Sequence, residues 1–298
     1  MKKIGKFPIE VFCNDFESKT ELSRLAVKQQ YCKYIKGTCV KPRKSTPQIK
    51  VGICSVGSTV NKGRTYHPVI ICPQRFKEDV MFDTIHEKYL YNWTNVKWIQ
   101  EVNIGVGGSV DYVAVEVDEH DRVKDFLCVE IQAAGTTGTP YEWVEELKEL
   151  GHYTDSRKKS FGINWANEFA KTMMQQAYKK GRIVESWHRK IVFVVQDLAM
   201  EYLQHTSDCS RLTSYNPDCP IDFCSFNLSW KEENGWTLAF DQIRSTTIEG
   251  INLILGGANV SMYPSVDEFI GNIVKKGISD GILQSNSYTR SQYEGNKQ

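Results

Sequence analysis

The chain has 298 residues, of which 41% are hydrophobic, and its 37 Lys and Arg residues nearly balance its 36 Asp and Glu residues. This length and composition are enough to bury one large core, or one core with a smaller appended module, and they exclude extensive disorder away from the ends. The N-terminus has positive charge with no apolar run behind it, and no segment is apolar for long enough to span a bilayer, so neither a signal peptide nor a membrane protein is predicted.

Positive charge is concentrated near the N-terminus. Between Leu22 and Lys77 there are twelve Lys or Arg residues and no Asp or Glu, which leaves 25 basic and 36 acidic residues in the rest of the chain. Such asymmetry is typical of a module that meets a polyanion, most often nucleic acid. The alternative is a basic surface that balances an acidic one within a dimer or a pair of domains. If the partner is DNA, the candidates for contacts with it are Lys41, Arg43, Lys44 and Arg75.

Four of the nine cysteines lie in this basic segment. Without an export signal, cysteines are expected to be reduced thiols in the cytoplasm. Cys32, Cys39, Cys54 and Cys72 come from turns and short strands, and four such thiolates would form a closed tetrahedral site for structural zinc or iron. Cys13 is a reserve ligand that could displace Cys32. Independent buried cysteines are the alternative, but the stretch from 32 to 54 has few large apolar residues and a metal would help it to fold.

Hydrophobic periodicity and turn residues predict the remaining elements. A helix is predicted over 78–87 and a strand over 96–102, followed by a bend at the glycines of 105–108 and a hairpin from Asp111 to Gln132. After the hairpin come helices over 141–150 and 165–180, the second closed by Lys179, Lys180 and Gly181, a buried strand over 190–197, a helix through 202, strands over 221–228 and 236–243, a helix over 266–277, and a polar tail over 285–298. This order predicts a mixed α/β sheet covered by helices. The other cysteines are interpreted as structural: Cys128, Cys209, Cys219 and Cys224.

The hairpin carries the candidate active site. Because side chains alternate along a strand, Glu130 and Gln132 share one face, where Asp111 of the partner strand can meet them. With the backbone carbonyl of Ile131, these residues provide the oxygen ligands that a hard divalent cation needs. Glu101 precedes the hairpin and could bring a further carboxylate, although an exposed strand Glu is an equally good interpretation. The alternative for the whole set is an ordinary hairpin with exposed carboxylates.

Asp111 followed by Glu130-x-Gln132 resembles the Asp…(Asp/Glu)-x-Lys constellation of nucleases, with Gln in place of the usual Lys. The other motifs make this likeness specific: Cys32-x₆-Cys39-Val40-Lys41, Gly52-Ile53-Cys54-Ser55-Val56, Ile71-Cys72-Pro73-Gln74-Arg75-Phe76, Glu101-Val102 and Gly108-Ser109-Val110-Asp111-Tyr112-Val113. Together they resemble the NotI-type restriction endonucleases, over roughly residues 8–205. The last third of the chain matches no pattern that we can name.

The resemblance implies a restriction-endonuclease-like mixed sheet flanked by helices, preceded by an N-terminal Cys₄ metal-binding module. The expected organisation is a basic, DNA-contacting module over 1–77, a nuclease core with a C-terminal extension over 78–284, and a tail over 285–298. It also implies a homodimer that cleaves a long palindromic DNA site with Mg²⁺, beside a Cys₄ site reported with iron. In that comparison Cys32, Cys39, Cys54 and Cys72 are the structural ligands, and Glu101, Asp111, Glu130 and Gln132 form the active site.

The predicted function is therefore that of a type II restriction endonuclease of the prokaryotic cytoplasm, with a cognate DNA methyltransferase in the same system. Asp111, Glu130 and the Ile131 carbonyl are expected to hold Mg²⁺, and Gln132 to orient the attacking water. Unlike Lys, Gln132 adds no positive charge and cannot take up a proton. The alternatives are a metal-stapled DNA-binding or regulatory protein without catalysis, and a structure-specific repair nuclease.

Overall fold

The computed structural model describes residues 2, 4–43, 46–61, 63–151, 160–256 and 265–280. The chain forms two compact units, Met1–Gly257 and Ala258–Gln298. The cysteine-bearing segment and most of the predicted nuclease core, up to Gly257, lie in one unit. The domain boundaries predicted at residues 77 and 284 stay predictions. Among the described residues, no helix combines the length and the apolar character that crossing a membrane requires.

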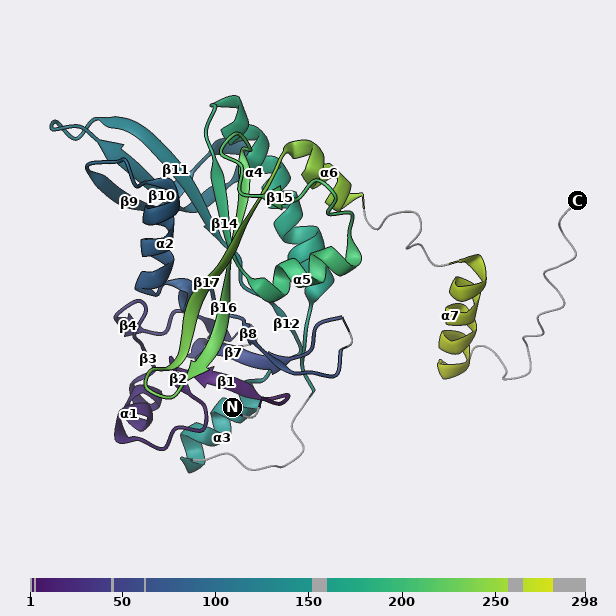
Figure 1. The fold of residues 1–298 in the computed structure, drawn as a ribbon. Coiled ribbons are helices and arrows are strands. Elements are labelled where there is room, and N and C mark those ends of the chain that lie inside the picture. The colour runs from purple at the N-terminus through teal and green to yellow at the C-terminus, as the bar shows by residue number, and fades with distance from the viewer. Residues whose placement is uncertain are drawn as a thin grey trace, which may run out of the picture. The chain divides into compact units, whose positions relative to one another are not determined.

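A seven-stranded mixed sheet is the centre of the first unit (Figure 1). Three neighbouring strands, β11, β14 and β16, run parallel, and the others are antiparallel. The predicted mixed α/β sheet is therefore confirmed. In spatial order the strands are β15 (Thr213–Ser214), β17 (Gly235–Thr246), β16 (Ile221–Lys231), β14 (Ile191–Gln196), β11 (Val123–Ile131), β10 (Ser109–Val117) and β9 (Val96–Asn103).

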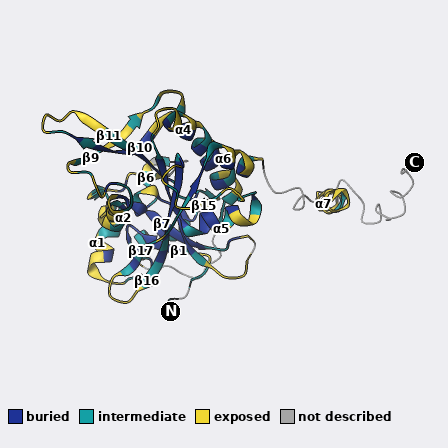
Figure 2. Ribbon diagram, turned by 45° about the horizontal axis from the view of Figure 1, so that its top comes forward, coloured by how far each residue is buried: buried dark blue, intermediate teal, exposed yellow. Residues whose placement is uncertain are grey.

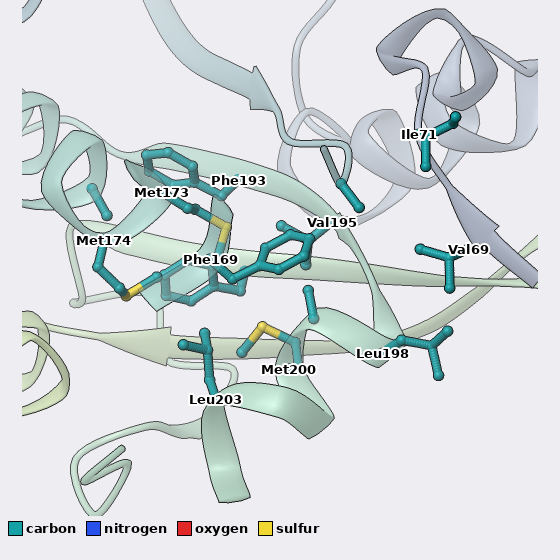
Figure 3. Close-up of a cluster of buried hydrophobic side chains, with 14 of the residues drawn as sticks. Val69, Ile71, Phe169, Met173, Met174, Phe193, Val195, Leu198, Met200 and Leu203 are labelled. Atoms are coloured by element: carbon teal, nitrogen blue, oxygen red, sulfur yellow. The ribbon is translucent and has the colours of Figure 1, made fainter. Parts of the chain in front are cut away.

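The central strand β14 is buried on both faces, as its continuous apolar sequence predicts. Phe193 and Val195 point into one hydrophobic cluster, and Val192 and Val194 into the other. Figure 3 shows the first cluster, in which Phe193 and Val195 of β14 lie with Phe169 and Met173 from the helical segment before this strand and with Met200 and Leu203 from α5 (Asp197–Thr206), which follows it. In Figure 2 the buried positions follow the central strands, while much of β9 and the far end of the β10–β11 hairpin are exposed.

Helices cover both faces of this sheet (Figure 1). The face of Phe193 packs against the helices after the hairpin, and the face of Val192 against α2. The helices are α1 (Glu21–Gln29), α2 (Asp79–Tyr89), α3 (Tyr141–Leu150), a π-helical stretch η3 (Ala166–Met173) that continues into α4 (Met174–Ser186), α5 (Asp197–Thr206) and α6 (Ile248–Leu255).

A second, four-stranded sheet is formed by the N-terminal residues, in the order β2-β1-β7-β8. The long strands β16 and β17 reach it from the central sheet (Figure 1). Its strands are β1 (Pro8–Val11), β2 (Asn14–Asp15), β7 (Ile53–Ser58) and β8 (His67–Ile70). The first unit also contains three short strand pairs, β3 (Tyr31–Cys32) with β4 (Gly37–Thr38), β5 (Pro42–Arg43) with β6 (Thr46–Lys50) and β12 (Thr136–Thr137) with β13 (Gly162–Ile163), and the 3₁₀ turns η1 (Pro73–Phe76) and η2 (Gly105–Gly107).

The second unit contains one described helix, α7 (Val266–Ser279). It begins with a capping box, in which the Ser265 hydroxyl accepts a hydrogen bond from the Glu268 amide and the Glu268 carboxylate accepts one from the Ser265 amide. The helix predicted over 266–277 is thus confirmed, whereas the tail predicted over 285–298 lies outside the described residues.

The end predicted for the second helix after the hairpin is wrong. Gly181 does not stop this helix, which continues as α4 to Ser186. A Cβ atom on Gly181 would lie 2.4 Å from Cδ1 of Ile221 and 3.1 Å from Cδ1 of Ile248. The glycine is therefore needed for close packing of α4 on β16 and α6. As a result Lys180, expected in the last turn, lies within the helix, and it is buried.

We predict that Gly181→Ala lowers the free energy of unfolding. Alanine is the better helix former by about 1 kcal/mol, but overpacking against the fully buried Ile221 costs roughly 1–3 kcal/mol, so the net change is destabilising. Chemical denaturation measures the difference. Gln175→Ala, at an exposed position of the same helix, is the control and should leave stability unchanged or slightly higher. A more stable Gly181→Ala protein would show that α4 does not need this close approach.

Candidate active site

Two carboxylates meet where β10 and β11 pair. Tyr112 pairs with Val129, which puts the preceding Asp111 across from the following Glu130. The Asp111 carboxylate accepts a hydrogen bond of 2.8 Å from the Ile131 amide, and the Asp111 amide lies 3.4 Å from Oε2 of Glu130. The predicted hairpin is therefore present, and it brings these two acidic side chains together.

Glu130 is also paired with a cation that lies outside the predicted motif. Lys180 of α4 donates to Oε1 of Glu130 at 2.6 Å and to the carbonyl of Ser109 at 2.8 Å. Only 4% of Lys180 and 6% of Glu130 is exposed. Burial and the neighbouring Asp111 raise the pKa of Glu130, while Lys180 acts in the opposite direction. The pair is thus a buried ion pair in direct contact with the candidate metal site.

One signal in the sequence points to Lys180. It lies at the spacing of the apolar stripe of its helix, between Ala177 and Val184, where a charged side chain is out of place. The adjacent Gly181 and the cationic pair Lys179 and Lys180 suggested a helix end instead. A charged residue on a buried stripe calls for a buried partner, and in this chain the partner is Glu130.

Glu101 lies across β10 from Glu130. Because Gln100 pairs with Tyr112, Glu101 is opposite Asp111, so the three acidic residues form one row across β9, β10 and β11. Its side chain is exposed, and its backbone has a φ of 54°, a left-handed conformation that is unusual inside a strand. The predicted role of Glu101 in metal binding therefore stays a prediction.

Gln132 follows the last residue of β11 and borders a cavity of about 600 Å³. Its backbone amide donates to the Val194 carbonyl at 2.9 Å, and its side-chain amide donates to the Ala133 carbonyl at 3.0 Å. The lining comes from the basic N-terminal segment and from residues at and after the end of β11, and it includes Lys41, Ile71, Ile131, Gln132, Thr136 and Glu168. The cavity therefore connects the basic N-terminal segment with the end of the strand that carries Glu130.

The candidate DNA-contacting residues have different surroundings. Lys41 lines this cavity and donates to the carbonyl of Ile71. The Arg43 side chain and all of Lys44 lie outside the described residues. The prediction that Arg75 contacts DNA is wrong, because its side chain is completely buried and no part of it is accessible to DNA.

A buried network surrounds Arg75. Its guanidinium donates to Glu10 at 2.9 Å, to Glu78 at 2.6 Å and to the Trp236 carbonyl at 2.9 Å. Glu10 also accepts a hydrogen bond of 2.7 Å from the Ser55 hydroxyl. These contacts join the N-terminal sheet to η1 and β17, so Arg75 is a structural residue.

Five buried cysteines line one small cavity of about 10 Å³, namely Cys13, Cys32, Cys39, Cys54 and Cys72. The Cys13 sulfur lies 3.5 Å from that of Cys32 and 4.0 Å from that of Cys54. In a tetrahedral site with metal–sulfur bonds of about 2.3 Å, sulfur atoms are roughly 3.8 Å apart. Thiols are suitable ligands for zinc or iron, and both distances from Cys13 are close to this value.

No group of three or more His, Cys, Asp or Glu side chains is arranged to hold a metal ion in the described part of the chain. For Mg²⁺ a smaller set of protein ligands is sufficient, because this ion keeps several waters and commonly binds through one or two carboxylates. Asp111 and Glu130 provide two carboxylates at adjacent positions. Their oxygen chemistry and their mutual repulsion fit a divalent cation.

We predict that Arg75→Leu lowers the free energy of unfolding by about 3–5 kcal/mol, because it leaves Glu10 buried and without its cation. The DNA affinity of the protein that remains folded should stay near that of the wild type. Arg64→Ala, at an exposed position of the same basic segment, is the control and should change stability by less than about 0.5 kcal/mol. Denaturation and gel-shift measurements test both variants. A stable Arg75→Leu protein with weakened DNA binding would restore Arg75 as a DNA contact.

Comparison with known proteins identifies the family. The model of the family described as "Restriction endonuclease NotI" matches residues 19–216, well over half of the chain, and the match includes Asp111, Glu130, Gln132 and Lys180. No curated protein matches this chain. The chain therefore belongs to the NotI restriction endonuclease family, whose members are type II restriction enzymes that hydrolyse the phosphodiester bonds of DNA.

Proposed function

We propose that this protein is a Mg²⁺-dependent endonuclease that cuts double-stranded DNA at a specific sequence. The observation that carries the proposal is the contact between Asp111 and Glu130 at adjacent positions of β10 and β11, one residue from Ile131 and two from Gln132. Family membership makes DNA cleavage the reaction, and this pair of carboxylates is where we place it.

Asp111, Glu130 and the carbonyl of Ile131 would hold the cation, with Glu101 as a further candidate ligand. When bound, Mg²⁺ lowers the pKa of a coordinated water and neutralises charge that develops on the phosphate. The protein prepares the ligands: the Ile131 amide fixes the Asp111 carboxylate, and the buried surroundings of Glu130 keep bulk water away. Gln132 adds a neutral hydrogen-bonding group beside them.

Gln132 is proposed to orient the attacking water. Its amide group donates to Ala133 in this structure, and a turn of the side chain would free it for the cavity that it borders. An amide can hold a water by hydrogen bonds, but it cannot accept a proton from it as a neutral amine can. The proton must therefore pass to another acceptor, such as solvent or the phosphate.

The cavity beside Gln132 is the proposed path of the DNA backbone. Lys41 stands on its wall, and the residues from Leu22 to Lys77 bring positive charge without any acidic residue. Binding through such a segment neutralises phosphates and should weaken steeply as salt rises. A cut in both strands needs two active sites, so we propose a homodimer that reads a palindrome, in a system with a separate cognate methyltransferase.

We also propose a structural Zn or Fe ion within the cysteine cluster. Cys32, Cys39, Cys54 and Cys72 are the ligands that the family pattern indicates, while the sulfur distances support Cys13 as a member. The pKa of Cys32 is raised by its hydrogen bond to Cys13 and by burial, so without a metal this thiol keeps its proton. A metal would replace their protons and join distant parts of the segment.

We predict that Asp111→Asn and Glu130→Gln each slow cleavage by about 10³-fold or more, because each removes a charged ligand from the metal site. Binding of the recognition sequence in Ca²⁺ should persist. Glu119→Gln, at the exposed turn of the same hairpin, is the matched control and should cut normally.

The test uses a phage genome with Mg²⁺, resolved on a gel. Discrete fragments from the wild type support sequence-specific cleavage. Random nicking would favour a repair nuclease, and no cleavage would favour a DNA-binding protein without catalysis. Normal cleavage by Asp111→Asn or Glu130→Gln would place the active site elsewhere.

For the cysteine cluster, we predict one bound Zn or Fe per chain in purified protein, measured by elemental analysis. Cys54→Ser, Cys32→Ser and Cys13→Ser should each lose the metal and lower the unfolding temperature, since each removes a thiolate of the cluster. Cys209 lies outside the cluster, so Cys209→Ser should keep the bound metal and the unfolding temperature of the wild type. Full metal content in Cys13→Ser would return the site to the four cysteines of the family pattern.

A further inference from the structure

The nuclease motif of this chain lacks its usual cation, and another element brings one to the same place. Gln132 occupies the position of the motif Lys and carries no charge. Lys180, 48 positions later in the chain, places its ammonium against Glu130 of the same motif. We propose that Lys180 is a positioning residue of this active site, which orients Glu130 and supplies the fixed positive charge that Gln132 lacks. The proposal rests on the proposed nuclease function.

The contacts of the Lys180 ammonium explain how it would orient Glu130. It binds Oε1 of Glu130 on β11 and the carbonyl of Ser109 on β10, so it bridges the two strands that carry the carboxylates. With Oε1 held, Oε2 is the oxygen on the side of Asp111, whose amide is 3.4 Å away. The rotation of the Glu130 carboxylate is therefore restricted, with one oxygen left for the cation.

The charges of the buried site lead to the same conclusion. Asp111 and Glu130 are like charges at adjacent positions, and Glu130 is almost wholly buried. Buried charges are costly unless they are paired. Lys180 reduces the net charge of the trio to a single negative charge before any metal arrives. It thereby makes two neighbouring carboxylates tolerable in a folded protein that has no cation bound.

Two features of α4 favour the contact between Lys180 and Glu130. Lys180 takes a position on the buried stripe of α4, and Gly181 beside it allows the helix to lie against Ile221. An apolar residue at position 180 would suit a purely structural stripe, and a buried ion pair is often no more stabilising than such a replacement. The contact with a proposed metal ligand explains why a lysine, and not an apolar residue, occupies position 180.

The experiment compares Lys180→Met with Lys179→Met, an exposed lysine one position away on the same helix. Thermal unfolding is measured with EDTA and with Mg²⁺, without DNA. Lys180→Met should unfold at a lower temperature in EDTA and recover more on addition of Mg²⁺ than the wild type does, because the divalent ion replaces the missing charge. Lys179→Met should behave as the wild type in both.

Activity supplies the second readout. Single-turnover cleavage by Lys180→Met should fall by about 10²–10³-fold, the range for loss of one fixed electrostatic group, with DNA affinity in Ca²⁺ unchanged. Should Lys180→Met not fold, the double variant Lys180→Met with Glu130→Gln removes both charges. It should fold, be more stable than Lys180→Met alone, and show less stabilisation by Mg²⁺.

Two outcomes would overturn the inference. One is an equal loss of unfolding temperature in EDTA and in Mg²⁺ with no rescue by Glu130→Gln, which would assign Lys180 to packing alone. The other is wild-type cleavage by Lys180→Met. Failure of the wild type itself to cleave DNA would refute the proposed function instead. The Mg²⁺ effect on unfolding would still report separately on the pairing of Lys180 with these carboxylates.

Discussion

The pairing of β10 with β11 forces two carboxylates together in a largely apolar sheet, and much of the surrounding structure accommodates that pair. Asp111 is held by a backbone amide, while Glu130 depends on Lys180. A lysine can reach Glu130 only if α4 lies close to the sheet, and Gly181 permits that approach. The pairing of β10 with β11, the ion pair between Lys180 and Glu130, and the packing of α4 on the sheet therefore depend on one another.

The buried Arg75 network has a comparable role for the N-terminal segment. Its partners Glu10, Glu78 and Trp236 come from three distant parts of the chain, so the guanidinium joins the N-terminal sheet to the end of β17. This connection is one of those that join the N-terminal segment and the central sheet in one compact unit. The turn η1, which carries Arg75, also supplies Pro73 to the wall of the cavity beside Gln132. Arg75, a charged residue of the basic segment, thus attaches this segment to the core.

Periodicity predicted the elements that local sequence determines. The hairpin, the doubly buried strand β14 and helix α3 were all correctly predicted, because alternation, a continuous apolar run and helical spacing are local patterns. The errors arose where a residue answers to distant partners. Gly181 looks like the end of a helix because the sequence does not show that Ile221 packs beside it. Arg75 looks like a surface charge because the sequence does not show that Glu10, 65 positions earlier, binds it.

The same limit explains what a motif can reveal about an active site. Asp111 and Glu130 could be predicted as candidate site residues because one hairpin brings them together, and a hairpin can be predicted from sequence. Lys180 approaches from a helix that follows in the chain, so its position depends on the packing of α4 and not on spacing within the motif. When Gln takes the last position of this nuclease motif, the motif residues alone therefore do not include the positive charge beside the carboxylates. In such a chain, a lysine on the buried stripe of a neighbouring helix is the place to look for the missing cation.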